Sequence, residues 1–493
     1  MRANTKLKIY VKKLAFLTPI LCLSLSLSSG VAHANPSTYA ANGVLGQSNF
    51  TNNGYGSSAT QFEYPSSTVI DTVHHRLFVA DDDNYRIQVY QLDNNDQIQS
   101  QTASYSLGAA SPASIGTDTL SQNSFYEGPY AMAYDPVNNR LFVEDYYRVL
   151  VFNLSNGISN NMNASYVIGE PDFVTDNDTT SQNTLSEPGA NGDGLAFDPT
   201  NDRLFVSDYT RIMVFNVSPS TLQTNGNGEN ASYVIGEPDF VTVNDSTSRN
   251  TLDTPNGIGY DPTNNSLYVG DYFGNRIMVY DVSPSTLQTN GNGENAYAVI
   301  GQPDFTTLNA GATQTEISYN YYSNASYAID PTDNQLFLAD QVNNRVLTYN
   351  FITMTNNSQL NGGTIGKSYS QTLTSEYAQG TVTYSVTGGS LPPGLSLNSS
   401  NGVVSGTPTS TGSYTFEITA YDNIGTAGTF QDDPSYTITI NSAGSTSQSV
   451  TAPNTGFGSP SKTNPITSFL IYGSVTASLF ALGFGIRKLS TKK

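Results

Sequence analysis

The chain has 493 residues, a formal net charge of −20 and a single cysteine. All 40 acidic residues lie between Asn35 and Thr455, where only 10 basic residues occur, so this span carries 10 minus 40, or −30. So acidic a span repels nucleic acid and anionic lipid, which excludes DNA and RNA as partners. Its length of about 420 residues is sufficient for two domains.

Residues 1–34 have the pattern of a secretory signal peptide. Five basic residues precede an apolar run from Leu14 to Leu27, and Ala32-His33-Ala34 supplies an A-x-A cleavage site. An uncleaved membrane anchor is the alternative. The only cysteine, Cys22, lies inside the apolar run, so the mature chain has no thiol for a disulfide or a metal site.

Residues 38–351 contain a long repeat that is marked by pairs of aspartates. The two members of a pair are 10 residues apart, and successive pairs start 64, 63, 63 and 69 residues apart. The pairs are Asp71/Asp81, Asp135/Asp145, Asp198/Asp208, Asp261/Asp271 and Asp330/Asp340. A period of that length, with strand-like residues between the marks, indicates a β repeat closed into a ring.

The fourth repeat predicts four antiparallel strands, at 257–261, 266–271, 276–280 and 296–301. Four strands per repeat are typical of a β-propeller blade. The fourth-strand signature also occurs before the first three-strand unit, at Gly43–Gly46, but not after the last one. We therefore expect this segment to pair with the fifth unit and to close a five-bladed ring, with six blades as the alternative.

Several of these segments resemble the NHL repeat. The resemblance rests on Pro255 to Ile277, on residues 77–90, and on the Ile-Gly-Glu/Gln-Pro-Asp-Phe runs at 168–173, 235–240 and 300–305. It implies a propeller fold for residues 38–351. It leaves the function open, because such propellers serve in binding, in scaffolding and in a few catalytic roles.

In every repeat a loop runs from the aspartate that ends the second strand to the arginine that starts the third. Recurrence in all five repeats favours a structural Asp–Arg pair that ties the two strands together. The loops of a propeller gather on one face, and aromatic rings there suit sugar or peptide recognition. The candidate ligand-binding residues are Tyr85, Tyr146, Tyr147, Tyr209, Tyr272 and Phe273.

Metal binding and catalysis find little support in the sequence. Asp81-Asp82-Asp83-Asn84 makes calcium possible, because carboxylates and amides are suitable hard ligands, although EF-hand spacing is absent. The mature chain has only His74 and His75, adjacent in a turn, which we expect to point apart. No catalytic residue is predicted. A surface enzyme that acts on polysaccharide through channel carboxylates is the alternative.

Residues 352–441 interrupt the repeat and predict a β-sandwich, because short alternating strands are separated by Gly/Pro turns. Gly389–Leu397 and Gly412–Asp422 resemble the Ig-like, cadherin-related modules of bacterial surface proteins, which usually serve as spacers. Residues 442–465 follow as a Ser/Thr/Gly-rich stalk, which we expect to be flexible.

The C-terminus resembles an LPxTG cell-wall sorting signal. Ala452-Pro453-Asn454-Thr455-Gly456 precedes an apolar stretch at 466–486, long enough for a transmembrane helix, and a basic cytoplasmic tail at 487–493. By that resemblance, a sortase-like transpeptidase attacks the carbonyl of Thr455, releases Gly456 onward and passes the threonine to the cell wall. Ala452 departs from the leucine of the family. The alternative is a helix that remains as a membrane anchor.

These features predict an all-β protein with a propeller, an Ig-like module, a signal peptide and a C-terminal transmembrane helix. It is expected on the extracellular face, anchored to the cell wall or membrane. There it would present the propeller to an unidentified glycan, peptide or protein, in an adhesion role. An inert envelope or spacer protein is a further alternative.

Overall fold

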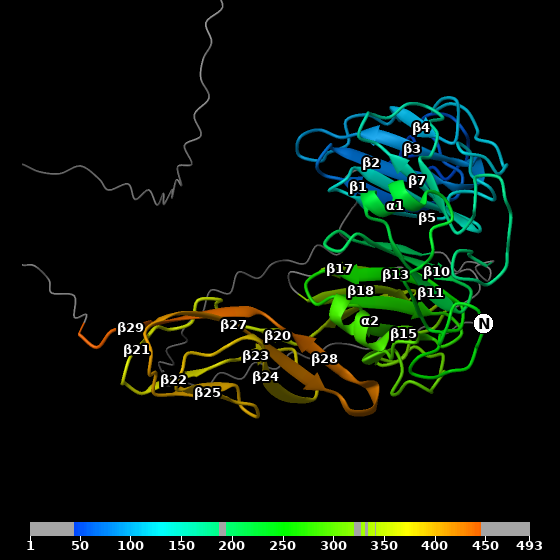
Figure 1. Ribbon diagram of the computed structural model, residues 1–493. Helices are drawn as coiled ribbons and strands as arrows, with labels where there is room; N and C mark the ends of the chain where they lie inside the picture. Colours follow the sequence, from blue (N-terminus) through cyan, green and yellow to red (C-terminus); the bar gives the residue numbers. More distant parts are fainter. Residues whose placement is uncertain (1–43, 187–193, 320–326, 331–333, 341, 445–493) are drawn as a thin grey trace, which may run out of the picture. The chain divides into compact units, whose positions relative to one another are not determined.

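The computed structural model describes residues 44–186, 194–319, 327–330, 334–340 and 342–444 (Figure 1). The signal peptide, Thr455, Gly456, the apolar stretch at 466–486 and the basic tail lie outside these residues, so what was inferred about them stays a prediction. Among the described residues, no helix has both the length and the apolar character needed to cross a membrane.

Residues 65–350 form five antiparallel sheets in chain order, four with four strands and the last with three. The first two sheets consist of β1 (Pro65–Asp71), β2 (Arg76–Asp81), β3 (Arg86–Gln91) and β4 (Tyr105–Leu107), then β5 (Ala131–Asp135), β6 (Arg140–Asp145), β7 (Arg148–Asn153) and β8 (Tyr166–Ile168). The other three consist of β9 (Leu195–Asp198), β10 (Arg203–Asp208), β11 (Arg211–Asn216) and β12 (Tyr233–Ile235), then β13 (Pro255–Asp261), β14 (Ser266–Asp271), β15 (Arg276–Asp281) and β16 (Ala298–Ile300), and finally β17 (Tyr327–Asp330), β18 (Gln335–Asp340) and β19 (Arg345–Asn350).

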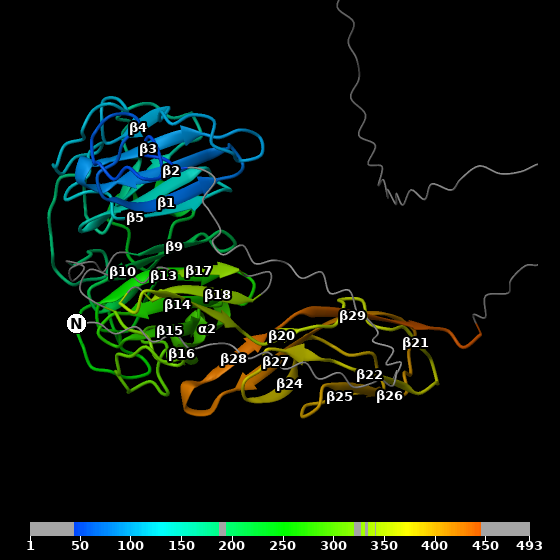
Figure 2. The ribbon, with the colours of Figure 1, turned by 180° about the vertical axis from the view of Figure 1, so that it is seen from behind.

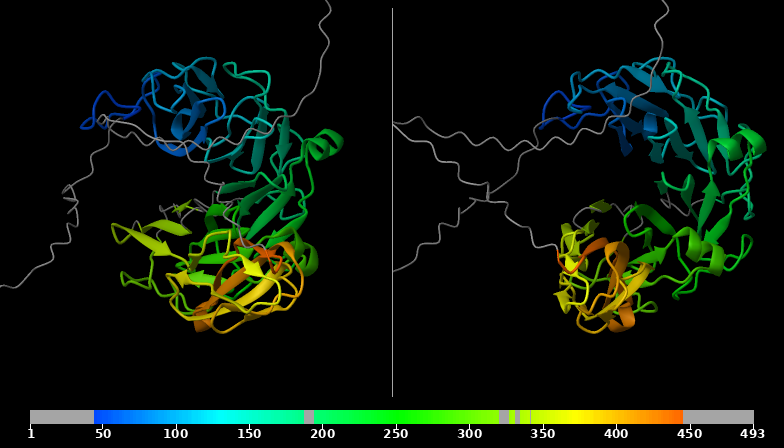
Figure 3. Two further views of the ribbon diagram at one scale, coloured as in Figure 1. Left: turned by 90° about the vertical axis from the view of Figure 1, so that its left-hand side faces the viewer. Right: turned by 60° about the vertical axis from the view of Figure 1, so that its left-hand side comes forward.

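Adjacent sheets pack through apolar side chains of their middle strands. Phe142 of the second sheet shares a fully buried cluster with Leu204 and Phe215 of the third. The first strands of neighbouring sheets touch in order, β1 with β5, β5 with β9, β9 with β13 and β13 with β17. Figure 3 shows the sheets following one another along the colour scale. The arrangement is that of propeller blades, which confirms the predicted propeller-like fold.

The last sheet differs from the prediction. Within the described residues β19 pairs with β18 alone, and residues 44–46 form no strand, so the expected pairing with the fifth sheet is wrong for these three residues, while Gly43 lies outside the described part of the chain. Leu45 packs instead against the apolar cluster of the first sheet, which includes Phe62. Gly46 lies so close to the Phe62 ring that a Cβ would clash with it. Contacts inside the first repeat therefore hold this segment away from the fifth sheet.

Two short helices occur in addition to the predicted strands. α1 (Pro219–Asn225) and α2 (Pro284–Asn290) have the same sequence and connect the third and fourth strands of their sheets. The Ser218 side chain caps α1 by accepting a hydrogen bond from the Thr221 N–H, Pro219 occupies the first turn, and Leu222 is buried. A Ser-Pro start is a recognised helix signal, so the sequence did contain this information.

Residues 353–441 form ten further strands in three sheets, and their buried side chains share one apolar cluster with those of the fourth and fifth sheets. These strands are β20 (Thr353–Met354), β21 (Gly363–Thr364), β22 (Tyr369–Thr372), β23 (Ser375–Glu376), β24 (Thr381–Gly389), β25 (Leu395–Asn398), β26 (Val403–Gly406), β27 (Gly412–Asn423), β28 (Thr429–Asp432) and β29 (Ser435–Asn441), labelled in Figures 1 and 2. Alternate residues of β29 (Tyr436, Ile438 and Ile440) are buried, as expected for a strand with one face on a core.

Two glycines with the same backbone conformation differ in how closely their surroundings pack. Gly169 (φ 89°) and Gly157 (φ 91°) share a left-handed backbone, but a Cβ on Gly169 would lie 2.7 Å from Leu185, whereas nothing lies within 4 Å of one on Gly157. Gly157→Ala should cost about 1–2 kcal/mol of unfolding free energy from backbone strain. Gly169→Ala should cost about 1–3 kcal/mol more from overpacking. Urea unfolding of both variants measures the difference, and equal losses would contradict this packing.

Candidate ligand-binding face

A buried ion pair closes the loop between the second and third strands of every sheet. The aspartate that ends the second strand lies opposite the arginine that starts the third, with oxygen–nitrogen distances of 2.5 to 2.8 Å. The pairs are Asp81–Arg86, Asp145–Arg148, Asp208–Arg211, Asp271–Arg276 and Asp340–Arg345. The first four arginine side chains are at most 1% exposed and the fifth is 24% exposed. These pairs are the structural ties that the repeats predict.

The arginines of the second, third and fourth sheets also hold the connection to the next sheet. Arg148 Nη1 donates to the Phe173 carbonyl at 2.6 Å, and Arg211 and Arg276 donate to Phe240 and Phe305 in the same way. These three phenylalanines end the Ile-Gly-Glu/Gln-Pro-Asp-Phe runs. The last residue of each run thus offers a backbone carbonyl to a buried guanidinium, which needs acceptors for all of its N–H groups.

The six predicted aromatic residues all lie in these loops, and the structure brings some of them together. Tyr146 lies edge-on to Tyr147, with ring centroids 4.2 Å apart, and Tyr272 lies edge-on to Phe273 at 4.5 Å. Tyr209 is 43% exposed and Phe273 is 53% exposed, whereas Tyr85, Tyr146, Tyr147 and Tyr272 are half-buried. Because successive sheets repeat the same strand order, their equivalent loops occupy the same side of the propeller. We call this side the aromatic face.

Sequence reasoning missed two tyrosines of the aromatic face. Tyr126 packs edge-on against Tyr146 at 5.7 Å, and its backbone N–H donates to Asp145. Tyr64 is 78% exposed, and its carbonyl accepts the N–H of Asp82. Both residues precede a first strand rather than lying between an Asp and an Arg. The only sequence signal was their position just before the strand that opens each repeat.

Carboxylates surround the rings of the aromatic face. Partial burial raises the pKa of Tyr85, and the negative charges of Asp118, Glu127, Asp83 and Asp82 raise it further. The pKa of Tyr126 is raised by the same effects, with Glu127, Asp176 and Asp118 as its charged neighbours. The arginines nearest this face are buried and paired, so they do little to offset this negative potential. Such a face attracts cationic groups and repels anions.

At the calcium site suggested for Asp81–Asn84, the Asp81 carboxylate already accepts hydrogen bonds from protein groups. Asp81 accepts hydrogen bonds from Arg86, from the Asn84 side chain and from the Glu63 N–H. The remaining acids of the loop, Asp82 and Asp83, lie in η1 (Asp82–Asn84). Over the described ranges, no group of three or more His, Cys, Asp or Glu side chains is placed to hold a metal ion.

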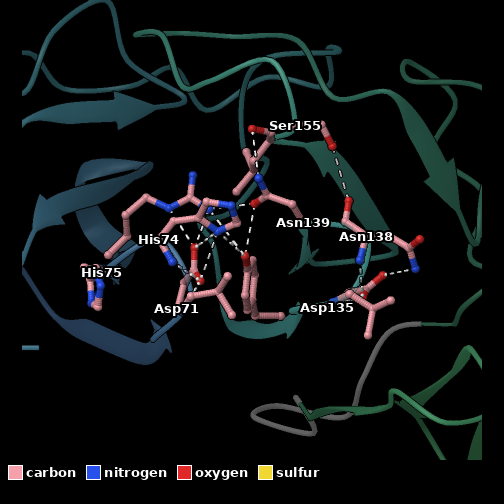
Figure 4. Close-up of polar contacts among 12 residues, drawn as sticks. Asp71, His74, His75, Asp135, Asn138, Asn139 and Ser155 are labelled. Carbon is pink, nitrogen blue, oxygen red and sulfur yellow. Dashed lines mark hydrogen bonds and ion pairs between the residues drawn. The ribbon is translucent and has the colours of Figure 1, made fainter. Parts of the chain in front are cut away.

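The two histidines diverge, as predicted (Figure 4). His74 Nδ1 lies 3.0 Å from Asp71 and 3.4 Å from the Tyr134 hydroxyl, whereas His75 Nδ1 lies 2.7 Å from Asp96. Asp71 is already committed, because it accepts Arg76 and the backbone N–H groups of the following turn. The first aspartate of a pair therefore caps a turn.

The same turn recurs in the next two sheets, which the sequence analysis did not anticipate. Asp135 accepts the Val137 and Asn138 N–H groups at 2.9 and 3.0 Å, and Arg140 at 2.8 Å (Figure 4). Asp198 pairs with Arg203 in the same manner, at 2.6 Å. Both aspartates of these repeats thus have structural partners, which leaves the aromatic loops as the candidate site.

Comparison with known proteins identifies one part of the chain. Residues 352–452 match the family described as "Putative Ig domain". The strands β20 to β29 therefore belong to an Ig-like domain, as their turns and alternation predicted. Among curated proteins, none matches the sequence.

Solved structures with some similarity differ widely in coverage. A periplasmic gluconolactonase from Pseudomonas aeruginosa is 12% identical, with 77% of this chain and 87% of that chain covered and a TM-score of 0.34. An auxiliary nutrient binding protein from Bacteroides ovatus is 12% identical, with 59% and 60% covered and a TM-score of 0.37. A putative alpha-galactosidase from Bacteroides fragilis is 22% identical with a TM-score of 0.16, and this chain spans only 18% of its length. No activity is transferred from such similarities.

The ion pairs predict unequal costs for two equivalent substitutions. Arg276→Ala leaves Asp271 buried without a cation and should lower the unfolding free energy by about 3–5 kcal/mol. Arg345→Ala should cost clearly less, because that side chain is 24% exposed and water can solvate Asp340 after the change. Denaturant unfolding compares the two variants. A larger loss for Arg345→Ala would contradict the role assigned to burial.

Proposed function

We propose that this protein is a surface-displayed binding protein whose five-bladed propeller carries the ligand site on its aromatic face. The observation that supports this most directly is the exposure of Tyr209 and Phe273 in loops that otherwise serve structural ion pairs. Buried pairing accounts for the aspartates and arginines of these loops, but it does not require exposed rings. Exposed rings with acidic neighbours fit an extracellular glycan, peptide or protein with exposed apolar and hydrogen-bonding groups.

Export and anchoring are part of the same proposal. The signal-peptide pattern at 1–34 and the sorting-like order from Ala452 to the basic tail support a chain that is secreted and then held at its C-terminus. The acidic span between the two basic ends fits this arrangement, since basic residues beside an apolar stretch favour the cytoplasmic side. The Ig-like domain would then act as a spacer between the envelope and the propeller.

Binding should depend on the exposed rings of the aromatic face. The span 35–455 is probed against glycan arrays and panels of cell-surface proteins, and each ligand found is titrated against Tyr209→Ala and Phe273→Ala. We expect at least about a tenfold weaker affinity for one of them, as for aromatic anchors at other interfaces. Tyr105→Ala is the control, because Tyr105 is 40% exposed on the outer strand β4.

Two outcomes of that screen would contradict the binding proposal. A complete absence of ligands across both panels would favour a spacer or envelope role. Turnover of a polysaccharide that is lost on replacing a channel carboxylate would favour an enzyme.

Anchoring is tested separately from ligand binding. If a sortase-like transpeptidase processes the motif at Thr455, then Thr455→Ala should move the protein from the cell-wall fraction to the membrane fraction. Ser461→Ala, outside the motif, should leave the distribution unchanged. Identical fractionation of Thr455→Ala and the unchanged protein would rule out sorting at this residue.

A further inference from the structure

Three side chains occupy equivalent positions in successive repeats, directly after the glycine that follows a fourth strand. Two of them are carboxyl groups, and the third is an amide, which has a nitrogen in place of one oxygen. They are Glu170, Glu237 and Gln302, the third residues of the Ile-Gly-Glu/Gln-Pro-Asp-Phe runs. The first two are fully buried and Gln302 is 4% exposed. A buried carboxyl group is costly unless it is fully hydrogen-bonded or neutral, so the groups around these residues decide which protonation state is stable.

The hydrogen bonds of Gln302 show which donors and acceptors surround this position. Its Nε2 donates to the carbonyl oxygens of Asn275 and Asn309 at 2.8 and 2.7 Å, and its Oε1 accepts the Asn309 N–H at 3.1 Å. The side-chain amide thus places its donor between two backbone acceptors and its acceptor on a backbone donor. The position therefore requires one hydrogen-bond donor and one acceptor.

The two glutamates take the same orientation. Glu170 Oε1 accepts the N–H of Asn177 at 2.8 Å, and Glu237 Oε1 accepts the N–H of Asn244 at 2.6 Å; both donors lie seven residues on, as Asn309 does from Gln302. The other oxygen, Oε2, is buried in both residues and has no hydrogen-bond partner in the described structure. It corresponds to the amide nitrogen of Gln302.

One of the two backbone acceptors of Gln302, the Asn275 carbonyl, has a counterpart beside each glutamate. The carbonyl oxygens of Tyr147 and Thr210 lie 2.9 and 3.0 Å from an ideal Cβ on Gly169 and Gly236, as the Asn275 carbonyl lies 3.3 Å from one on Gly301. An ionised carboxylate would therefore present a negative oxygen to carbonyl oxygens, which repel it. A proton or a metal cation between these atoms removes the repulsion.

The spacing favours the proton. Calcium takes six to eight oxygen ligands at about 2.3–2.6 Å each, and magnesium needs near-octahedral geometry. The Gln302 nitrogen touches its two acceptors at hydrogen-bond distance, which leaves no room for an ion between equivalent atoms. A protonated carboxyl group fits, because O–H···O contacts of about 2.5–3.0 Å are normal hydrogen bonds.

We propose that Glu170 and Glu237 each retain a proton in the folded protein and donate it to backbone carbonyl oxygens, as the Gln302 amide does. Each glutamate is then a proton-binding site inside the propeller. The second and third sheets should lose stability when the protons leave, because the resulting charges are buried among acceptors.

The charges around Glu170 agree with a retained proton. Burial raises its pKa from the ordinary value of 4.5 to about 7, against the opposing effect of the Asn177 N–H. Asp176 and Asp172 raise the pKa further and Arg148 lowers it. Arg148 is already paired with Asp145, so its charge is not free to stabilise a second carboxylate.

Glu237 has one contact more than Glu170, because its Oε1 also accepts the Thr210 hydroxyl at 2.7 Å. Burial raises its pKa, whereas the Thr210 hydroxyl, the Asn244 N–H and Arg211 lower it. Asp239 raises it. As in the preceding sheet, the arginine is committed to an aspartate, in this case Asp208.

The direction of the pH effect follows from the two states. In the unfolded chain Glu170 has its ordinary pKa of 4.5 and releases its proton near that pH. In the folded protein its pKa is about 7, so the proton is held until the pH approaches that value. The stabilisation is therefore complete below pH 4.5 and is lost as the pH rises through 7. Stability should fall over this interval and change little, through this group, above it.

The test replaces the two carboxyl groups by amides and, in a second variant, the amide by a carboxyl group. Thermal unfolding of the full chain is followed by calorimetry at pH 5 and pH 8, for the unchanged protein and for the double variant Glu170→Gln/Glu237→Gln. We expect the double variant to melt a few degrees higher than the unchanged protein at pH 8 and at nearly the same temperature at pH 5. The converse variant, Gln302→Glu, adds a third such group, so its melting temperature should fall further between pH 5 and pH 8 than that of the unchanged protein.

Infrared spectroscopy detects the retained proton directly. The infrared band of protonated carboxylic acids should be present at pH 6 in the unchanged protein and reduced in the double variant. The proposal is overturned if the unchanged protein and the double variant show the same pH dependence. It is also overturned if calcium or sodium ions raise the melting temperature at pH 8 in the unchanged protein but not in the double variant, since a cation would then occupy the site.

Discussion

The buried Asp–Arg pair is the interaction on which every blade depends. Each pair removes two charges from water, and it is favourable only because the remaining N–H groups and oxygens find partners nearby. In the second sheet the arginine meets this condition by reaching the Phe173 carbonyl of the following loop, and the aspartate by accepting a backbone N–H ahead of the first strand of its own sheet. One ion pair thus fixes both a hairpin and the passage to the neighbouring sheet.

The same pairs determine the charge of the surface. Of the nine arginines between residues 35 and 455, eight form ion pairs with aspartates in the described structure. Most of the positive charge is therefore neutralised inside the fold, while acids such as Asp118 and Glu127 remain at the surface. The aromatic face carries excess negative charge because most arginines are paired with aspartates inside the fold. This negative charge also favours protonation of buried carboxyl groups such as Glu170.

Periodic features of this protein could be predicted from sequence, whereas single contacts could not. The strand expected at 266–271 is β14, and the Asp–Arg ties recur as anticipated, because each depends on residues repeated at fixed spacing. The contact of Tyr126 with Tyr146 depends on how two loops of different lengths meet, which no repeat encodes. The position of Leu45 was also mispredicted. Its sequence matches the fourth-strand pattern, but its side chain packs against the cluster of the first sheet that includes Phe62.

The confinement of arginine to buried strand ends also affects how the folded protein meets proteases. Trypsin-like enzymes cut beside basic side chains that can enter their specificity pocket, and Arg86, Arg148 and Arg276 are inaccessible. Arg249 and Lys367 are exposed, one in a loop between sheets and one in the Ig-like domain. The described part of the protein thus offers such proteases few points of attack while it stays folded.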